Sequence, residues 1–175
     1  MTRNKSYLNR RFEQTAADIV ESIDRDVERG EDILMLGFGS VMMSTFFAVV
    51  VPPSILLPIV ALIFAVSASL ARINYFNMER KLKTVMAPLG GTELAILRPI
   101  AVVFAEQPMP SLTHSFNPLK NLPRAGKSLL GGLLINPLWM PIFYTMGLQI
   151  HEEKNLVSLN KAVMGVEQNL LLRAL

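Results

Sequence analysis

The hydropathy pattern of the chain is dominated by two apolar runs that contain no charged residue. The longer run covers residues 33–71, and Pro52 and Pro53 interrupt it near its middle. It is about twice the length that a helix needs to cross the ~30 Å hydrocarbon core of a bilayer, and proline ends or kinks a helix. The pattern therefore predicts a transmembrane helical hairpin with arms at 33–51 and 55–71 and a turn at the proline pair.

Both predicted arms carry small residues at every fourth position, which places these residues along one ridge of each helix. Small residues let helix backbones approach closely in lipid, where apolar burial alone gives no preference for helix over lipid. A turn at the proline pair brings the two ridges face to face, so we expect them to form the contact between the arms. Coincidental spacing of common residues is the alternative. The ridges consist of Ser40, Ser44 and Ala48 on the first arm and Ala61, Ala65 and Ser69 on the second.

Residues 1–32 show the pattern of a water-soluble amphipathic helix. One stripe of apolar residues recurs at spacings of three and four, as on one face of an α-helix. The other faces carry several acidic residues, which anionic lipid headgroups repel. We therefore expect the stripe to contact protein and not the membrane surface. Its members are Leu8, Phe12, Ala16, Ile19, Ile23 and Val27.

Basic residues flank both ends of the predicted hairpin, whereas its turn has no charge. Arg25 and Arg29 precede the first arm, and Arg72, Arg80 and Lys81 follow the second. By the positive-inside rule, both ends of the hairpin are then cytoplasmic and the turn faces outward. This predicts a multi-pass protein of the bacterial inner membrane with a cytoplasmic N-terminus.

Residues 72–127 are expected to form a basic cytoplasmic linker. Eight Lys or Arg residues stand against three acidic residues in this segment, a balance that suits contact with the anionic headgroups of a bilayer. Thr92 is a suitable N-cap for a short helix within the linker, and Pro99 is expected to end or kink that helix.

The second uncharged run covers residues 128–150. Its length permits a third span. Asn136, Pro137 and Pro141 near its centre favour a broken or re-entrant element, which a bilayer tolerates only where protein covers the freed backbone groups. The sequence leaves both interpretations open.

The last segment, 151–175, is predicted to be a C-terminal amphipathic helix with the seam of a coiled coil or bundle. Apolar residues alternate along it at spacings of three and four, but the segment is too short to form a stable helix alone in water. It therefore needs a partner, either within the chain or on another subunit, and we predict that the seam is a partner-binding surface. The seam consists of Leu156, Leu159, Val163, Val166 and Leu170.

Composition supports the membrane interpretation and limits the chemistry. Hydrophobic residues make up 51% of the 175 residues, and the mean hydropathy is +0.37, which is high for a soluble domain of this size. The chain has no cysteine, so disulfides, thiolate metal ligands and cysteine nucleophiles are excluded. The hairpin has no ionisable group for a proton relay or an ion site, which argues against a self-contained transporter.

Two features are candidates for chemistry, and both have simpler explanations. Residues 121–128 resemble the second half of a phosphate-binding loop, but Asn121 stands in place of its first glycine and Pro123 lacks an amide donor. A basic turn next to the membrane explains the same residues. His114 has no carboxylate at metal-ligand spacing, and the carboxylates adjoining His151 do not face it on a helix. We therefore expect no catalytic residue, cofactor, metal site or nucleic-acid partner.

Together these patterns predict an all-α integral membrane protein, with a transmembrane hairpin flanked by amphipathic helices and a second apolar segment broken by proline. This layout resembles the small hairpin subunits of bacterial secretion and conjugation complexes, a resemblance of architecture without a shared motif. It implies a non-catalytic inner-membrane subunit whose partners are other membrane proteins or further copies of itself, in a bilayer with anionic headgroups. A membrane-shaping hairpin wedge and a small interfacial enzyme that uses His114 or His151 are the alternatives.

Overall fold

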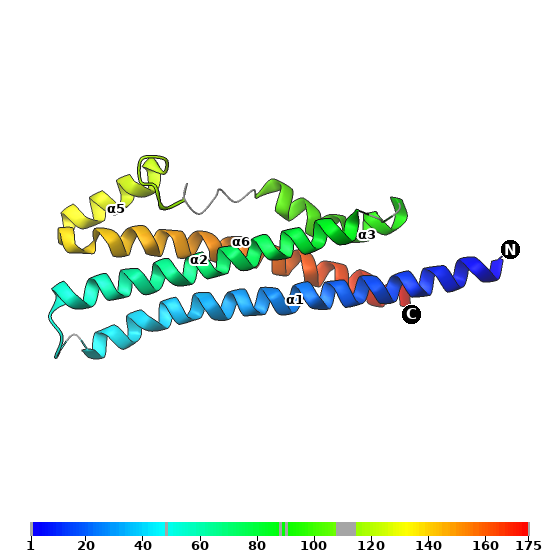
Figure 1. The fold of residues 1–175 in the computed structure, drawn as a ribbon, viewed down its shortest axis with the longest axis horizontal. Coiled ribbons are helices and arrows are strands. Elements are labelled where there is room, and N and C mark those ends of the chain that lie inside the picture. Colours follow the sequence, from blue (N-terminus) through cyan, green and yellow to red (C-terminus); the bar gives the residue numbers. More distant parts are fainter. Residues whose placement is uncertain (1, 48, 88, 90, 108–114, 175) are drawn as a thin grey trace. The chain divides into compact units, whose positions relative to one another are not determined.

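The computed structural model describes residues 2–47, 49–87, 89, 91–107 and 115–174, and all regular structure in this part of the chain is helical (Figure 1). The predicted all-α class is therefore confirmed for the described residues. The elements are α1 (Thr2–Phe47), α2 (Pro53–Met86), α3 (Gly91–Glu106), α5 (Leu122–Leu134), the short 3₁₀ helix η1 (Pro137–Trp139) and α6 (Met140–Ala174).

The chain divides into two compact units. Unit 1 consists of Met1–Arg29, Asn74–Pro108 and Asn155–Leu175, and unit 2 of Gly30–Ile73 and Met109–Lys154. Helices α1, α2 and α6 each contribute one part to unit 1 and another to unit 2. The segment boundaries that the sequence predicted at residues 32, 71 and 150 fall inside these helices. No proline lies close to these positions to end a helix there. The predicted helices 1–32 and 151–175 are thus parts of longer ones.

The core of unit 1 is built from four helical segments that each bury a stripe of side chains. The buried positions recur at spacings of three and four, as expected for amphipathic helices. The rings of Tyr75 on α2 and Phe104 on α3 pack with centroids 4.7 Å apart. The side chains of Leu8 and Phe12 lie outside the described part of the chain. The core residues are Ala16, Val20, Ile23 and Val27 of α1; Tyr75, Met78 and Leu82 of α2; Leu97, Ile100 and Phe104 of α3; and Leu156, Leu159, Val163 and Val166 of α6.

Unit 2 contains a helical hairpin formed by the end of α1 and the start of α2 (Figure 1). The amides of Val50 and Val51 bond the carbonyl of Phe47, at 3.0 and 2.8 Å, and close the C-terminus of α1. Pro53 begins α2, a position that suits proline because the first-turn amides of a helix have no partner within it. Pro58 lies inside α2, and the helix continues beyond it to Met86.

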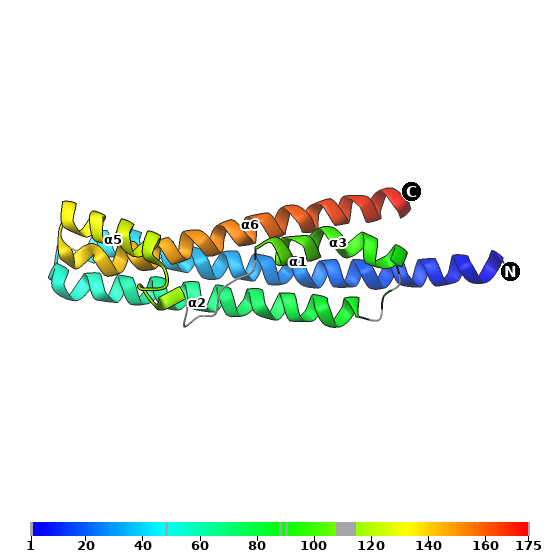
Figure 2. The same cartoon turned by 90° about the horizontal axis from the view of Figure 1, so that it is seen from above.

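The second uncharged run is broken into two helices and is not one continuous span. Helix α5 ends at Leu134, η1 begins at Pro137, and α6 begins at Met140, which agrees with the bias of a residue before proline against helix. Helices α5 and α6 lie side by side (Figure 2). A Cβ placed on Gly132 would lie 2.2 Å from Cγ of Met140, so glycine permits this close approach.

The helix expected within the linker is α3, which passes through Pro99 without ending there. The first part of the predicted linker, residues 72–86, belongs to α2. This difference has a simple cause, since no proline occurs between Pro58 and Pro88 and nothing in the sequence ends the helix earlier.

Candidate functional site

Exposed apolar side chains are distributed unevenly between the two units. Among the described residues, those of unit 2 extend over α1, α2, α5 and the connecting turns, and Phe46, Val49, Val50 and Leu134 are 77% to 90% exposed. Water-soluble proteins rarely expose contiguous apolar patches of this kind. The described residues of unit 2 therefore fit an apolar environment. Among the side chains that the structure describes in unit 1, the exposed large apolar ones are Val102, Val157, Met164, Leu171 and Leu172.

Helix α2 is the one helix in the described part of the chain that is long and apolar enough to cross a membrane. Its uncharged part, residues 53–71, spans about 28 Å, close to the ~30 Å of a hydrocarbon core. The apolar part of α1, residues 33–47, is about 22 Å long, and α5 is about 20 Å long, so both are shorter than that core. Core helices of soluble proteins can be equally long and apolar. The exposed apolar surface of unit 2 is a second observation, and the two together indicate membrane association.

A buried ion pair lies in unit 2 where the two uncharged runs end. Arg72 of α2 donates hydrogen bonds to a carboxylate oxygen of Glu152 on α6 and to the hydroxyl of Ser115. All three residues are at most 2% exposed. Removing two charges from water costs several kcal/mol per ion unless the pair and its hydrogen bonds compensate. The contact therefore fixes α2 against α6 in one register within this unit.

The segment that precedes α5 is held at the same place. The Tyr144 hydroxyl donates a hydrogen bond of 2.7 Å to the Ser115 carbonyl oxygen, and the Asn121 amide donates one of 3.3 Å to that oxygen. Burial raises the pKa of Glu152, and the adjacent Arg72 guanidinium opposes this rise. Oε2 of Glu152 has no hydrogen-bond partner among the described residues. These groups form a buried polar cluster in unit 2.

The hydropathy pattern assigns Arg72 only to the basic flank of the hairpin and gives Glu152 no partner, so sequence reasoning missed the pair. A signal is nevertheless present. Arg72 is the first charge after the run 33–71, and Glu152 is the first carboxylate after the run 128–150. Because an unpaired charge next to buried apolar surface is costly, two uncharged helical runs that end in opposite charges indicate a pair between their ends.

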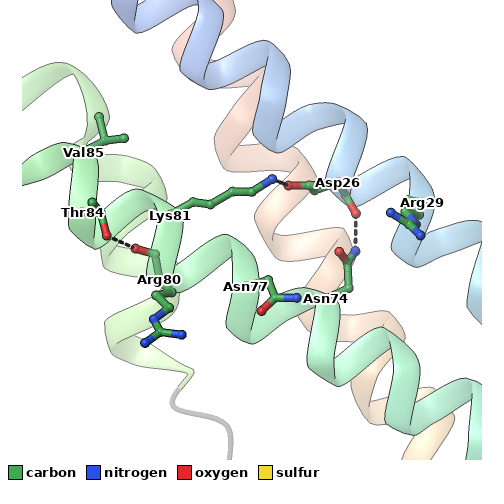
Figure 3. Close-up of a pocket in the computed structure, with 8 residues that line it drawn as sticks. All are labelled: Asp26, Arg29, Asn74, Asn77, Arg80, Lys81, Thr84 and Val85. Carbon is green, nitrogen blue, oxygen red and sulfur yellow. Dashed lines mark hydrogen bonds and ion pairs between the residues drawn. The ribbon is translucent and has the colours of Figure 1, made fainter.

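A polar cavity of about 540 Å³ lies between α1 and α2 in unit 1. Figure 3 shows Lys81 and Asn74 reaching from α2 toward α1, where Lys81 pairs with the Asp26 carboxylate and the Asn74 amide donates to the Asp26 carbonyl. Arg29 and Arg80 also line the cavity. The lining contains one carboxylate and no histidine, so it lacks an acid–base pair. We interpret these contacts as a polar connection between the two helices.

His151 on α6 lies in a basic environment within unit 2. Burial lowers its pKa, and the positive charges of Arg124, Arg72 and Lys154 lower it further. The folded state therefore favours neutral His151 and binds its proton less tightly than the unfolded state. We expect this residue to contribute stability that is complete above about pH 6.5 and is lost as the pH falls through the folded pKa.

Thermal unfolding in a mild detergent between pH 7.5 and 5.5 measures this dependence. The midpoint of the wild-type protein is expected to fall more on acidification than that of His151→Gln, because only the wild type gains a proton at this position on unfolding. Both proteins retain His114, so the difference between their curves isolates His151. Parallel curves would contradict the assignment.

The predicted small-residue ridges are described in part. Ala61 is buried in the core of unit 2, and Ala65 and Ser69 are half-buried on the same helix. Ser40 and Ser44 are half-buried, and their hydroxyls donate to carbonyl oxygens of their own helix at 2.6 and 2.7 Å. Ala48 lies outside the described residues. The face-to-face pairing of the ridges stays a prediction.

The contacts that the structure shows between the two arms involve a glycine and two aromatic rings. A Cβ at Gly37 of α1 would lie 2.5 Å from Oγ of Ser67 on α2, so a larger residue at this point would have to displace neighbouring side chains. The rings of Phe38 and Phe64 meet edge to face, with centroids 6.0 Å apart and planes at 77°. Gln149 of α6 also reaches this point, and its amide donates to the Leu34 carbonyl.

The predicted seam of α6 packs within unit 1. Leu156, Leu159, Val163 and Val166 are at most 1% exposed, so the partner that these side chains need lies within the chain. Leu170 is half-buried and lines an apolar cavity of about 350 Å³ between α1 and α6. Contact between Leu170, the last residue of the seam, and another subunit stays a prediction.

The structure tests one of the two sequence features that were candidates for chemistry, the phosphate-loop-like residues 121–128, and describes only one of the two histidines. Residues 122–128 form the first turns of α5, so they are helical and do not form a phosphate-binding loop. His114 lies outside the described residues. Among the described residues, no three His, Cys, Asp or Glu side chains cluster in a way that could hold a metal ion.

Comparison with known proteins found no match: no protein-family model, no curated protein and no solved structure is significantly similar to this chain.

Proposed function

We propose that this chain is a non-catalytic membrane subunit whose unit 2 lies in a bilayer and whose unit 1 lies in water. The observation that carries the proposal is the contrast between the two surfaces, because exposed large apolar side chains concentrate in unit 2 among the described residues. Helix α2 is apolar enough to cross the bilayer. The buried Arg72–Glu152 pair then keeps these two charges of unit 2 away from lipid.

The orientation follows from the distribution of basic residues. Arg25 and Arg29 precede the apolar end of α1, and Arg80 and Lys81 follow the apolar part of α2. In the proposed orientation both flanks are cytoplasmic, the N-terminus is cytoplasmic, and the turn at Pro52 faces outward. The membrane is proposed to be the bacterial inner membrane, with the chain crossing it more than once.

Assembly with other proteins is proposed from the end of α6. Leu171 and Leu172 are 67% and 71% exposed, and Leu171 lines the apolar cavity between α1 and α6 together with Ala17 and Val20. These residues lie in unit 1, where few of the described large apolar side chains are exposed. They suit a contact with another subunit or a second copy, as in a secretion or conjugation machine.

Purification in a mild detergent tests the assembly part of the proposal. The wild-type protein is expected to run as an oligomer, or to retain membrane-protein partners, in size-exclusion chromatography with light scattering. Leu171→Ser with Leu172→Ser is expected to release it as a folded monomer with unchanged helical content by circular dichroism, because both side chains are exposed. Val102→Ser, also exposed and in unit 1, is the matched control. A monomeric wild type without partners would refute the assembly.

The second candidate function is a membrane-shaping wedge, which one observation favours. The apolar part of α1 and the whole of α5 are about 22 and 20 Å long, too short to cross a ~30 Å core. A hairpin whose α1 arm is this short fits insertion into one leaflet. In that case the turn is buried in lipid and unreachable from outside the cell.

A further inference from the structure

A second cavity, of about 400 Å³, lies between the first turns of α5 and the middle of α6 in unit 2. Its lining is basic. Arg124 and Lys127 come from α5, and His151 and Lys154 come from α6. None of the described residues that line it carries a carboxylate. Pro123, Gly147 and Ile150 complete the lining.

The glycine of α6 shapes the wall of this cavity. A Cβ at Gly147 would lie 3.4 Å from Cγ and 3.7 Å from Nε of Arg124, so the stem of the arginine packs closely against the α6 backbone. This contact holds the arginine at the wall, where its planar group can bind a phosphate through two hydrogen bonds. Lys127 stands one turn further along α5 and adds a second cation.

The cavity has a positive potential with several sources. Helix α5 begins beside it at Leu122, and Asn121 provides no side-chain cap, so the helix dipole adds partial positive charge there. The lowered pKa of His151 arises from burial and from the cations Arg124, Arg72 and Lys154. A bound anion would compensate the positive charge around this cavity.

The surface of unit 2 changes from basic to apolar at this cavity. Beyond Lys127, the exposed side chains of α5 are leucines over its last two turns. A free phosphate ion fits the basic wall alone, whereas a phospholipid fits both the wall and the leucines. The exposed leucines are Leu129, Leu130, Leu133 and Leu134, which are 51% to 84% exposed.

We infer that this cavity binds the phosphate of an anionic phospholipid whose acyl chains lie along the exposed leucines of α5. Basic pockets next to membrane helices are known sites for anionic headgroups. The inference rests on the proposed placement of unit 2 in a bilayer, and it adds one defined lipid site to the general attraction between a basic chain and an anionic membrane.

Lipid titration of the full-length protein in neutral detergent micelles tests this site. A ligand that binds only the folded state raises the unfolding midpoint in proportion to its occupancy. We expect a saturable rise with phosphatidylglycerol and none with phosphatidylcholine at the same mole fraction. Inorganic phosphate is the free-anion control and is expected to need a far higher concentration. An equal rise with inorganic phosphate would overturn the lipid assignment.

Paired charge variants identify the cavity as the site. In Arg124→Gln with Lys127→Gln, the phosphatidylglycerol concentration at half-saturation is expected to increase about 30-fold, since each basic residue near an anionic surface contributes about fivefold. Arg80→Gln with Lys83→Gln removes two exposed cations from unit 1 and is expected to leave the curve unchanged. Equally weakened phosphatidylglycerol binding in both double variants would overturn the inference, because it would indicate a general attraction between basic residues and anionic lipid and no defined site.

Partition into phosphatidylcholine vesicles separates this inference from the proposed function. The wild type and both double variants are expected to partition equally, because insertion depends on the apolar surface and not on the cavity. A wild type that does not partition would refute the membrane placement itself. Normal partition without any preference for phosphatidylglycerol would refute only the lipid site.

Discussion

Removing one member of the Arg72–Glu152 pair is expected to lower the free energy of unfolding by about 3–5 kcal/mol, because the remaining charge stays buried without its partner. Both side chains are 2% exposed, so water cannot replace the lost contact. Arg72→Met or Glu152→Leu is expected to show this loss in chemical unfolding in a mild detergent. The Ser115 hydroxyl also loses its hydrogen bond in Arg72→Met.

The double variant Arg72→Met with Glu152→Leu distinguishes a lost ion pair from general damage to the core. Replacing both charges of a buried pair with apolar groups is often neutral or stabilising, so the double variant is expected to regain most of the stability. Lys83→Met, which breaks the exposed Lys83–Glu79 pair on α2, is the control and should change stability by less than about 1 kcal/mol. Losses that simply add in the double variant would contradict the pairing.

Gly37→Leu is expected to destabilise unit 2 by about 3 kcal/mol or more, since overpacking a tight contact typically costs about 1–3 kcal/mol and a leucine is much larger than the space allows. A Cβ at this position would lie 2.2 Å from Nε2 of Gln149 and 2.5 Å from Oγ of Ser67. Gln149 is fully buried and bonds the Leu34 carbonyl, so it cannot move away without losing that bond.

Gly39 provides the matched control, two residues further along the same helix. Nothing lies within 4 Å of a Cβ placed there, so Gly39→Leu is expected to be neutral or to stabilise the helix by up to about 1 kcal/mol. Combining Gly37→Leu with Gln149→Ala removes the group that the leucine meets first and is expected to recover part of the loss. Equal effects of leucine at positions 37 and 39 would contradict the close approach of the helices.

Much of the helical layout could be predicted from uncharged runs and proline positions. The pair Pro52 and Pro53 separates α1 from α2, and Pro137 marks the break between α5 and α6. Ala16, Ile23 and Val27 of the stripe that was predicted to contact protein are buried in unit 1, and Ile19 of that stripe is half-buried. These predictions rest on local physics, because periodicity and proline act within a few residues along the chain.

The candidate site was harder to predict, because it depends on contacts between distant segments. Arg72 and Glu152 are 80 residues apart, and a pattern of local spacings cannot connect positions so far apart. The pattern of Leu156 and Leu159 shows that a seam exists but not which helix fills it. Gly37 escaped notice because a single glycine has no periodicity, although a Cβ there would meet Ser67 and Gln149.

The accessibility of the hairpin turn in intact bacterial cells tests the proposed membrane placement most directly. The chain has no native cysteine, so single cysteines report their own positions. With a membrane-impermeant maleimide, Ser54→Cys at the start of α2 is expected to react in intact cells, whereas Thr84→Cys, exposed in unit 1, reacts only after permeabilisation. A Ser54→Cys variant that stays protected until the membrane is dissolved, or a Thr84→Cys variant that reacts in intact cells, would contradict a hairpin that crosses the membrane with its flanks inside.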